Sequence, residues 1–444
     1  MSTSGSAPAR RRAIVVGGGI AGLLAARVLT RHFERVTILD RDLLPAGPDP
    51  RAGAPQSHHV HVLLTRGWRI MSELFPDLGP ALAAAGAHEI DWLDDVAWHT
   101  PFGEAPRVPS QLRSRACTRG LLEYLAREAL IADARVRVHS GVEVTGLQAQ
   151  GERIVGVQVH RRSGAPELAD DDLRADLVVD ASGRASKAPT WLAALGYPEP
   201  PETVIDAQLG YATRLYELTA RPDWKVLYAM GKPGKNPRGG VVYPVEGGRH
   251  IVTLVGYGGT FPPVDEAGFL EFAGALETPA LRDALVGAVP CSAIHGYRKT
   301  ENRLRHYEKL RRWPAGLVVL GDAACALNPV YGQGMSVAAV AATVLDAALR
   351  ARPEQPLGLR FQKRLAAGNL AAFMTASSDD LRWPGTTGKV SPGLKLMHRL
   401  VDRIFAAATR SPEIHLRLVE VLHLMRPSHA LFHPSVLRRA LLRR

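Results

Sequence analysis

The sequence predicts an α/β fold, in which a domain built on a parallel sheet is interrupted by an inserted antiparallel sheet and followed by a helical C-terminal region. Three observations support this prediction: a strand, turn, helix and strand near the N-terminus, short buried strands that recur far along the chain, and a middle segment of alternating polarity. A chain of 444 residues is also too long for one compact core, so we expect two or three substructures.

The N-terminal unit opens the predicted parallel sheet. Arg12 to Val16 is a short β-branched run, three glycines follow it, and apolar residues then recur at helical spacing up to Leu29. A second strand, Val36 to Leu39, ends at Asp40. This order of elements is a βαβ unit of the length expected for a parallel sheet.

Strands of the same kind recur later in the chain. Residues 176–180 and 316–320 are buried runs that each end in a turn of small residues. Residues 121–130 read as a helix and residues 136–144 as a further strand. We therefore expect one parallel sheet that is assembled from distant parts of the chain.

The middle and the end of the chain have different patterns. Residues 206–255 alternate in polarity and carry a hairpin signal at residues 246–248, which indicates an antiparallel sheet, and helical patterns dominate after Leu349. The predicted boundaries are 10–80, 110–190 and 295–350 for the parallel-sheet domain, 81–109 and 191–294 for the inserted domain, and 351–444 for the helical C-terminal region.

Composition argues against several classes of protein. The net charge of +12 is spread along the chain without a recognition motif, so we expect no nucleic-acid partner. No apolar run approaches the length of about eighteen residues that a membrane span needs. The three cysteines are too widely spaced for a metal site or a disulfide framework, so we expect no metal and three core thiols. Met1 to Ala9 predicts a tail on a cytoplasmic protein rather than a signal peptide.

A dinucleotide-binding motif follows the first strand. Residues 17–22 form a G-x-G-x-x-G pattern, in which the glycines make the turn, let the backbone approach a pyrophosphate, and let helix and strand pack closely. The N-terminus of the helix adds free N–H groups, and Asp40 stands where an acid binds an adenosine ribose. The predicted contacts of this unit are Gly17, Gly19, Ile20, Ala21, Gly22, Asp40 and Arg41.

A second group of motifs lies far from the first. Gly321-Asp322 ends a strand where a carboxylate can hold a ribityl hydroxyl, and the glycine-rich turn of residues 328–335 points backbone N–H groups at an anion or an electron-rich ring. Residues 180–186 form a small-residue turn after a buried strand. Arg119 stands at the start of a predicted helix, and a guanidinium can donate two hydrogen bonds to phosphate oxygens. We therefore favour Arg119 over the nearby Arg115 as the phosphate-binding arginine.

With these motifs the sequence resembles the FAD-dependent monooxygenases of the para-hydroxybenzoate hydroxylase fold, from about residue 12 to at least residue 385. The resemblance implies a Rossmann-like FAD-binding domain, with Asp322 on the ribityl chain and the loop after Pro329 beside the flavin ring. The implied FAD contacts beyond the first motif are Arg119, Val144, Asp180, Gly183, Gly321, Asp322, Gly334 and Met335. The implied flavin-side loop contains Pro329, Gly332, Gln333, Gly334 and Met335, and the catalytic residue stays unassigned.

Within that family the closest likeness is to bacterial flavin epoxidases and hydroxylases of polyketide pathways. Residues 55–64, 328–335 and 378–384 carry it. The first stretch contains His58, His59 and His61, which invite a metal hypothesis. Their spacing does not converge easily and no acidic partner is nearby, so a loop close to the flavin is the favoured interpretation.

The resemblance implies that reduced flavin and O2 form a C4a-hydroperoxide that gives one oxygen atom to an alkene or an activated ring. NADPH or NADH would supply the electrons, directly or through a separate flavin reductase. The alternating strands of the inserted domain predict an apolar wall, so we expect an apolar, polyketide- or terpenoid-like substrate. The predicted substrate contacts are Tyr211, Thr213, Val242 and Pro244.

Three alternatives stay open at this stage. A flavin-dependent prenyl-chain reductase shares much of the scaffold and would saturate double bonds rather than oxygenate them. A flavin halogenase is disfavoured, because its Trp-x-Trp-x-Ile segment is absent from the sequence. A protein that holds FAD only structurally would catalyse a redox-neutral cyclisation or serve as a binding module. Oxygen consumption coupled to substrate turnover separates these cases.

Overall fold

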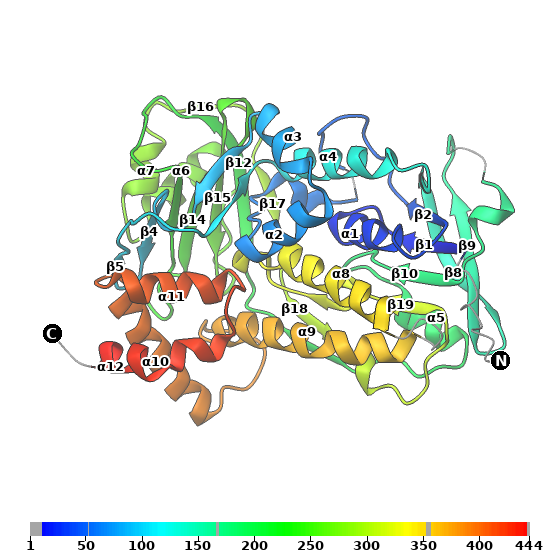
Figure 1. Cartoon of the computed structure of the whole chain (residues 1–444). Helices are drawn as coiled ribbons and strands as arrows, with labels where there is room; N and C mark the ends of the chain where they lie inside the picture. Colours follow the sequence, from blue (N-terminus) through cyan, green and yellow to red (C-terminus); the bar gives the residue numbers. More distant parts are fainter. Residues whose placement is uncertain (1–10, 52, 166–167, 352–356, 442–444) are drawn as a thin grey trace.

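The computed structural model describes residues 11–51, 53–165, 168–351 and 357–441. The predicted tail, Met1 to Ala9, and the predicted domain start at residue 10 lie outside these ranges. Figure 1 shows two lobes, one around a parallel sheet and one around a larger, mostly antiparallel sheet, with long helices running between them. The predicted α/β fold with an additional antiparallel sheet and C-terminal helices is confirmed.

The parallel sheet is assembled from distant segments, as the sequence predicts. Its strand order is β19-β10-β1-β2-β7, and every neighbouring pair is parallel. The carboxyl ends of all five strands therefore meet at one edge, which is where such sheets bind ligands. The strands are β1 (Arg12–Val16), β2 (Arg35–Asp40), β7 (Val136–Ser140), β10 (Leu177–Asp180) and β19 (Leu317–Val319).

Helices from three parts of the chain cover this sheet. α8 packs against α1, α2 and α9 (Gly358–Asp380), and 56% of it is buried. A mostly buried core helix can have the length and apolarity of a membrane span, as α8 does. The core of this lobe is formed by Leu, Ile, Val and Ala side chains of the sheet and these helices. The helices are α1 (Ile20–Leu29), α2 (Thr65–Leu74), α3 (Leu78–Ala84), α4 (Arg119–Ile131), α5 (Ala188–Ala194) and α8 (Gly334–Ala351).

One predicted strand of this lobe is in fact two. The expected strand over residues 136–144 ends at Ser140 and restarts as β8 (Val142–Gln150), which pairs with β9 (Arg153–Arg161). Gly141 separates them with φ of +72°, a conformation that favours glycine. The break turns the chain out of the parallel sheet and into a separate two-stranded ribbon.

The second sheet combines residues from three segments. Its order is β16-β12-β15-β14-β13-β4-β5, with β17 also paired to β12 and with β4 parallel to β13. The boundary at residue 295 is therefore wrong, because β17 belongs to this sheet. The strands are β4 (Val96–Thr100), β5 (Gly103–Glu104), β12 (Gly210–Glu217), β13 (Val226–Ala229), β14 (Arg238–Pro244), β15 (His250–Gly256), β16 (Val289–Pro290) and β17 (His295–Tyr297).

The two faces of the second sheet have different neighbours. Helices α6 (Glu266–Gly274) and α7 (Ala280–Ala284) cover one face with Phe269, Phe272 and Leu281. The opposite face packs partly against the C-terminal helices, through Ile404 and Leu418. Helices therefore enclose the sheet on both sides, as Figure 1 shows.

The C-terminal region is helical, as predicted, and prolines begin three of its helices. α10, α11 and α12 each have proline at their first position, where the missing N–H has no intrahelical partner to lose. Small sheets and single turns link the two lobes. The C-terminal helices are α9 (Gly358–Asp380), α10 (Pro392–Ala408), α11 (Pro412–Leu422) and α12 (Pro434–Leu441). The linking strands are β3 (His88–Asp91), β6 (Arg113–Ala116), β11 (Glu202–Ile205), β18 (Asn302–Arg305) and β20 (Cys325–Ala326).

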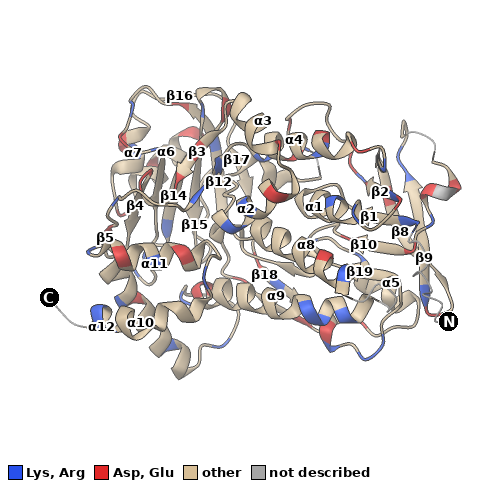
Figure 2. Ribbon diagram, in the orientation of Figure 1, with Lys and Arg blue, Asp and Glu red and all other residues tan. Residues whose placement is uncertain are grey.

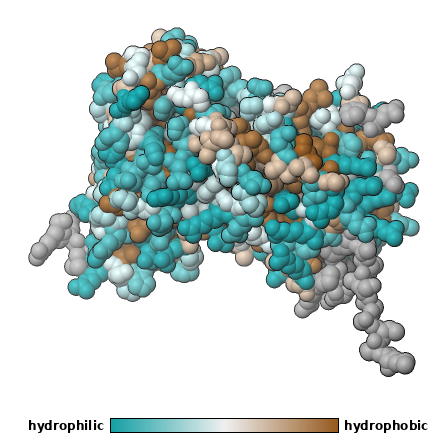
Figure 3. All heavy atoms as spheres, turned by 45° about the horizontal axis from the view of Figure 1, so that its top comes forward, coloured by the Kyte–Doolittle hydropathy of each residue, from teal (hydrophilic) through white to brown (hydrophobic). Residues whose placement is uncertain are grey.

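The surface of the described chain is polar and of mixed charge. Figure 2 shows basic residues scattered over both lobes and interspersed with acidic ones. On the face seen in Figure 3, apolar residues form only smaller areas within a mostly hydrophilic exterior. The prediction that all three cysteines are core thiols is wrong for Cys291, which is exposed, while Cys117 and Cys325 are buried.

Candidate active site

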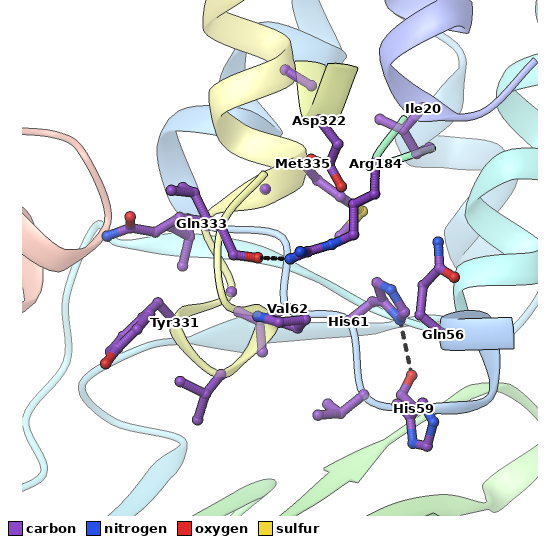
Figure 4. Close-up of a pocket in the computed structure, with 18 of the residues that line it drawn as sticks. Ile20, Gln56, His59, His61, Val62, Arg184, Asp322, Tyr331, Gln333 and Met335 are labelled. Atoms are coloured by element: carbon purple, nitrogen blue, oxygen red, sulfur yellow. Dashed lines mark hydrogen bonds between the residues drawn. The ribbon is translucent and has the colours of Figure 1, made fainter. Parts of the chain in front are cut away.

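A cavity of about 1010 Å³ lies at the carboxyl edge of the parallel sheet and continues to the second sheet and the C-terminal helices. It is lined at one end by the turn after β1 and the end of β2, and at the other by β13, β14 and α10. The loop of residues 327–335 lies between these ends. Figure 4 shows part of this cavity, with side chains from both lobes and from α8 around it.

The first glycine motif adopts the conformation that its spacing predicts. Gly17 has φ of +99°, and a Cβ there would lie 2.7 Å from the carbonyl oxygen of Ala181. A Cβ on Gly22 would lie 1.8 Å from the Gly17 carbonyl oxygen, so this glycine allows the close packing of α1 on the turn. Gly19 faces the cavity, and a Cβ there would meet only side-chain ends. The backbone at Gly19 is thus open to a ligand.

Asp40 lies at the cavity end of β2, as predicted, and it already holds the turn in place. Its carboxylate accepts hydrogen bonds from the backbone N–H groups of Gly18 (2.6 Å) and Asp42 (2.8 Å). It also pairs with Arg51, at 2.8 Å. Arg41, the next residue, lines the cavity beside it. The acid therefore both shapes the glycine turn and contributes to the cavity wall.

Two arginines and a glutamate surround the glycine turn. Glu123 on α4 pairs with Arg119 at 2.5 Å and with Arg51 at 3.2 Å. Burial raises the pKa of the Glu123 carboxyl, but Arg119 and Arg51 outweigh it and hold that pKa below its usual value. Both guanidinium groups lie within 4 Å of the position that a Cβ of Gly19 would take. Arg115 instead pairs with Glu89 on the β3–β6 ribbon.

Sequence reasoning missed Arg51. The residue lies in a loop after β2 that has no motif, and only the tertiary structure brings it to Glu123 and the glycine turn. Burial lowers the pKa of its guanidinium, and Glu123, Asp40 and Asp42 together outweigh this and raise it. A largely buried arginine next to two other cavity-lining groups is the kind of donor that binds phosphate oxygens.

Asp322 and Arg184 form the opposite wall. Asp322 lines the cavity just after β19, and burial raises the pKa of its carboxyl while Arg184 and Arg119 oppose that rise. Only burial and these two charges act on the pKa of its carboxyl, and no hydrogen bond from a described residue contributes. Arg184 donates to the carbonyl oxygens of Glu301 (2.7 Å) and Leu327, which fixes its guanidinium at the loop. Figure 4 shows Arg184 reaching between Asp322 and the Gln333 loop.

The loop of residues 328–335 reaches the cavity before α8 begins. Gly332 has φ of +62°, and a Cβ there would lie 3.1 Å from Val62. The Gln333 side chain is 2% exposed, and its Oε1 lacks a hydrogen-bond partner in the described structure. Pro329, Gly332, Gln333, Gly334 and Met335 all line the cavity, as do Ile20, Ala21, Val144 and Gly183.

Three predicted cofactor residues do not line the cavity. Asp180 is fully buried at the end of β10, where Ser182 and Ser186 donate hydrogen bonds to its carboxylate, both at 2.5 Å. It therefore shapes the turn that carries Gly183 and Arg184. Gly321 packs against Ala21, and Gly22 packs against Gly17. In the structure these three residues shape the turns around the cavity.

The predicted substrate residues divide between the two faces of the second sheet. Tyr211 lines the cavity, but Val242 packs with Phe269 under α6, and Pro244 does not line the cavity either. Along β14 the prediction chose residues on the other face of the sheet. Val241, which pairs with Thr253, is the residue of this strand that faces the cavity. Thr213 lies on the same face as Thr253 but does not line the cavity, and its hydroxyl is hydrogen-bonded to that of Thr253 at 2.7 Å.

The three histidines of residues 58–61 diverge. His58 stacks on His295 at 4.0 Å, and His59 Nδ1 bonds the Thr213 hydroxyl at 2.7 Å. His61 Nδ1 donates to the His59 carbonyl oxygen at 2.9 Å, as the dashed line in Figure 4 marks. Burial lowers the pKa of His59 to about 3 and that of His61 to about 4. Within the described ranges, no group of three or more metal-binding side chains converges.

Known proteins are similar to this chain over most of its length. Residues 10–352 match the FAD binding domain family. Protein Rv3254 of Mycobacterium tuberculosis is 30% identical over 408 residues, which cover 90% of this chain and 82% of that protein. Kynurenine 3-monooxygenase of Salinispora tropica is 28% identical over 84% of this chain and 81% of its own. The structure of PqsL, a probable FAD-dependent monooxygenase from Pseudomonas aeruginosa, has a TM-score of 0.61 at 16% identity, over 84% of this chain and 98% of its own.

The residues of the cavity fit FAD. Gly19 leaves its backbone open, and Arg51 and Arg119 lie beside it, which suits a pyrophosphate. Asp322 is a cavity carboxylate that no described residue bonds, which suits a ribityl hydroxyl. The orphaned Gln333 Oε1 is an acceptor at the loop before α8. These groups all line one continuous cavity.

Proposed function

The chain belongs to the FAD binding domain family and is an FAD-dependent monooxygenase, and on that premise we propose that it adds one oxygen atom from O2 to an apolar, polyketide- or terpenoid-like substrate, by epoxidation or hydroxylation. In this proposal the adenosine end of FAD lies at Asp40, the pyrophosphate at Gly19 and Arg119, and the ribityl chain at Asp322. Reduced flavin supplies the activated oxygen, and the protein supplies binding, orientation and a dry pocket.

The observation that carries the proposal is the apolar part of the cavity. Beyond the loop of residues 328–335, its wall is made largely by aromatic and aliphatic side chains of β4, β13, β14 and α10. Burying such surface stabilises a complex by about 25 cal/mol per Å². A mostly hydrocarbon substrate gains more from this wall than a small acid does. Representative members of the wall are Trp98, Tyr228, Met230, Val241, Met397 and Phe405.

The loop of residues 328–335 separates the two parts of the cavity. Met335 and Val330 line it at the point where the substrate and the flavin ring would meet. Its apolar groups would keep water from the reacting oxygen, which is the usual reason for enclosing such a site. The chain's part in the reaction is then to orient the substrate, and a catalytic acid or base is not required for epoxidation.

The proposed reductant is NADPH or NADH, used directly or through a separate flavin reductase. Both routes deliver two electrons to the flavin before O2 reacts. Rapid mixing of the FAD-loaded protein with NADPH, with and without a flavin reductase, distinguishes the two routes by the rate of flavin bleaching. Since reduced nicotinamide is a cytoplasmic reductant, the cytoplasm is the proposed place of action.

The experiment that tests the function supplies reduced FAD, O2 and an apolar polyene and measures the product by mass spectrometry. A gain of one oxygen atom supports the proposal. A gain of two hydrogens and no oxygen would instead identify a double-bond reductase. Turnover confined to small charged aromatics would contradict the apolar substrate.

Two neighbouring residues provide a matched test of the substrate wall. Val241 faces the cavity, whereas Val242 is fully buried against Phe269 on the other face. Val241→Phe should raise KM for the polyene at least about tenfold by filling the cavity, with the melting temperature nearly unchanged. Val242→Ala should lower stability by about 2 kcal/mol and leave KM unchanged. The reverse pattern would mean that the substrate lies on the other face.

A further inference from the structure

The segment of residues 378–384, at the end of α9, has no part in the FAD site described above. It places two adjacent carboxylates, Asp379 and Asp380, beside the loop of residues 328–335. Asp380 is fully buried, whereas the Asp379 side chain is 40% exposed and lines the cavity. The pair therefore reaches from the protein interior to the cavity wall.

Asp380 is bonded to groups from two elements that flank the cavity. It accepts hydrogen bonds from the Nδ2 groups of Asn302 (2.6 Å) and Asn328 (3.1 Å to each oxygen) and from the Tyr331 hydroxyl (2.6 Å). Asn302 lies on β18, and Asn328 and Tyr331 lie at the two ends of the turn that starts the loop. Three donors on one buried carboxylate satisfy it in its ionised form.

The same contacts orient Asn328. Because its Nδ2 donates to Asp380, its Oδ1 turns toward the backbone N–H of Val330 (3.2 Å) and the Tyr211 hydroxyl (3.4 Å). Its own backbone N–H donates to Asn302 Oδ1 at 2.7 Å. The side-chain hydrogen bonds of Asn328 therefore connect the start of the loop to Asp380, and the Tyr331 hydroxyl makes a second connection.

Tyr331 connects Asp380 with the cavity. Its hydroxyl lies 2.6 Å from Asp380 Oδ1 and 3.2 Å from Asp379 Oδ2, but it has only one proton to donate. When Asp380 is ionised, that proton points inward to Asp380. When Asp380 carries a proton, Asp380 donates to the Tyr331 oxygen, and the Tyr331 proton turns outward to Asp379 on the cavity wall.

We propose that Asp380 is the positioning residue of the loop of residues 328–335, and that its protonation state sets the direction of the Tyr331 hydroxyl and so the polarity of the cavity wall beside the flavin. The inference rests on the proposed position of the flavin ring against this loop. In this proposal the loop responds to protonation of Asp380, a response that the monooxygenase reaction does not itself require.

The charged and titratable groups around Asp380 place this change near neutral pH. Burial raises the pKa of Asp380 to about 7, with Tyr331 and Asn328 opposing the rise and Asp379 adding to it. Burial also raises the pKa values of Tyr331, Tyr211 and Tyr257, so these three hydroxyls keep their protons near neutral pH. Beyond Asp379 lie Arg382, His398 and Asp402, of which the last two belong to α10.

Asp380→Asn reproduces the protonated arrangement without a titratable group. The amide oxygen of the new asparagine takes the place of Asp380 Oδ2, and it still accepts hydrogen bonds from Asn302 and Asn328. Its Nδ2 then donates to the Tyr331 oxygen, and Tyr331 donates to Asp379. All partners remain bonded, so the variant should fold and bind FAD.

The experiment records the visible absorbance and circular dichroism of bound FAD between about pH 5 and about pH 9 in four proteins. The wild type should show a spectral shift with a midpoint of about 7, and Asp380→Asn should keep the low-pH spectrum throughout. Tyr331→Phe should lose the shift, because the link between Asp380 and the cavity is cut. The matched control is Asp346→Asn, whose carboxylate bonds Arg350 and His32 away from the cavity and whose shift should equal that of the wild type.

Two results would overturn the inference. One is a wild-type spectrum that is constant over this range, and the other is an Asp380→Asn or Tyr331→Phe protein that keeps the wild-type midpoint. Thermal stability provides a second measurement if a variant binds FAD weakly. Because the folded pKa of Asp380 lies above the ordinary value of 3.8, wild-type stability should fall as pH rises toward about 7 and level off above it, while that of Asp380→Asn should not fall. An Asp322→Asn protein that binds FAD as tightly as the wild type would instead refute the proposed cofactor site, and that outcome is separate from these.

Discussion

Substituting Gly19 with valine tests whether the first glycine turn holds the cofactor. Gly19 has φ of −77° and ψ of −179°, an extended conformation that any residue adopts. A Cβ there would meet only the ends of the Arg51, Glu123 and Arg119 side chains, at 3.2, 3.6 and 3.9 Å. The folded protein therefore accepts a side chain at this position, and the space that the side chain fills is the space assigned to the pyrophosphate.

The expected loss of FAD affinity follows from the contacts that the valine prevents. A hydrogen bond between a backbone N–H and a charged phosphate oxygen contributes about 1.5–3 kcal/mol, and the N-terminus of α1 contributes a further 0.3–1 kcal/mol or so. A combined loss of about 3 kcal/mol corresponds to a dissociation constant about a hundredfold higher, since about 1.4 kcal/mol is a factor of ten. The valine also replaces a favourable residue at the helix N-cap, which costs about 1 kcal/mol of stability.

The assay titrates the FAD-free protein with FAD and follows flavin fluorescence, with thermal unfolding measured in parallel. Gly368→Ala is the matched control, because a Cβ on this residue in α9 meets nothing within 4 Å. It should bind FAD as the wild type does. Gly22→Ala should fail to fold, because its Cβ would lie 1.8 Å from the Gly17 carbonyl oxygen. A Gly19→Val protein that folds and binds FAD with the wild-type dissociation constant would refute the assignment of the turn to the cofactor.

The remaining predictions concern Asp322 and the buried histidine His423. Asp322→Ala should raise the dissociation constant of FAD roughly ten- to a hundredfold with the fold retained, through loss of a charge-assisted hydrogen bond of about 1.5–3 kcal/mol, and an unchanged constant by fluorescence titration would show that the carboxylate does not contact FAD. Burial lowers the pKa of His423 to about 3, and its Nδ1 accepts the backbone N–H of Thr65 at 3.2 Å, so it must stay neutral in the folded protein. The unfolded chain therefore binds one more proton at this residue between about pH 6.5 and about pH 3, and stability should fall as pH decreases through that window, by up to about 1.4 kcal/mol per pH unit. His423→Gln should reduce the slope of unfolding free energy against pH in urea titrations, the exposed His429→Gln should not, and equal slopes in all three proteins would contradict the argument.

The features that local sequence determines were predicted well. The turn at Gly17 and Gly22 depends on a positive φ and on a helix packing against its own strand, and both are properties of a few consecutive residues. The strand that precedes Asp322, β19, and the helix α8 after the glycine-rich turn are predicted for the same reason. Hydrophobic period and glycine position specify such units without reference to the rest of the chain.

Side-chain direction within these units was predicted less well. Asp180 follows a buried strand just as Asp322 does, yet it turns inward to Ser182 and Ser186 while Asp322 lines the cavity. Asp180 ends β10 and Asp322 follows β19, two neighbouring strands of the same parallel sheet. The difference arises from the two serines that bond Asp180, a contact that strand pattern alone does not reveal.

By itself, the sequence determined the parallel sheet, the glycine turn and the presence of an alternating sheet, because each follows from local conformation. Only the tertiary structure decided which face of that second sheet meets the cavity. Alternation shows that Val241 and Val242 point in opposite directions, but it gives no preference between them, since both are apolar. The packing of α6 and α7 on one face settles the choice. In the same way, Arg51 reaches the cavity and Asp380 reaches the loop beside it from segments without a cofactor motif, because ion pairs and hydrogen bonds between distant parts of the chain place them there.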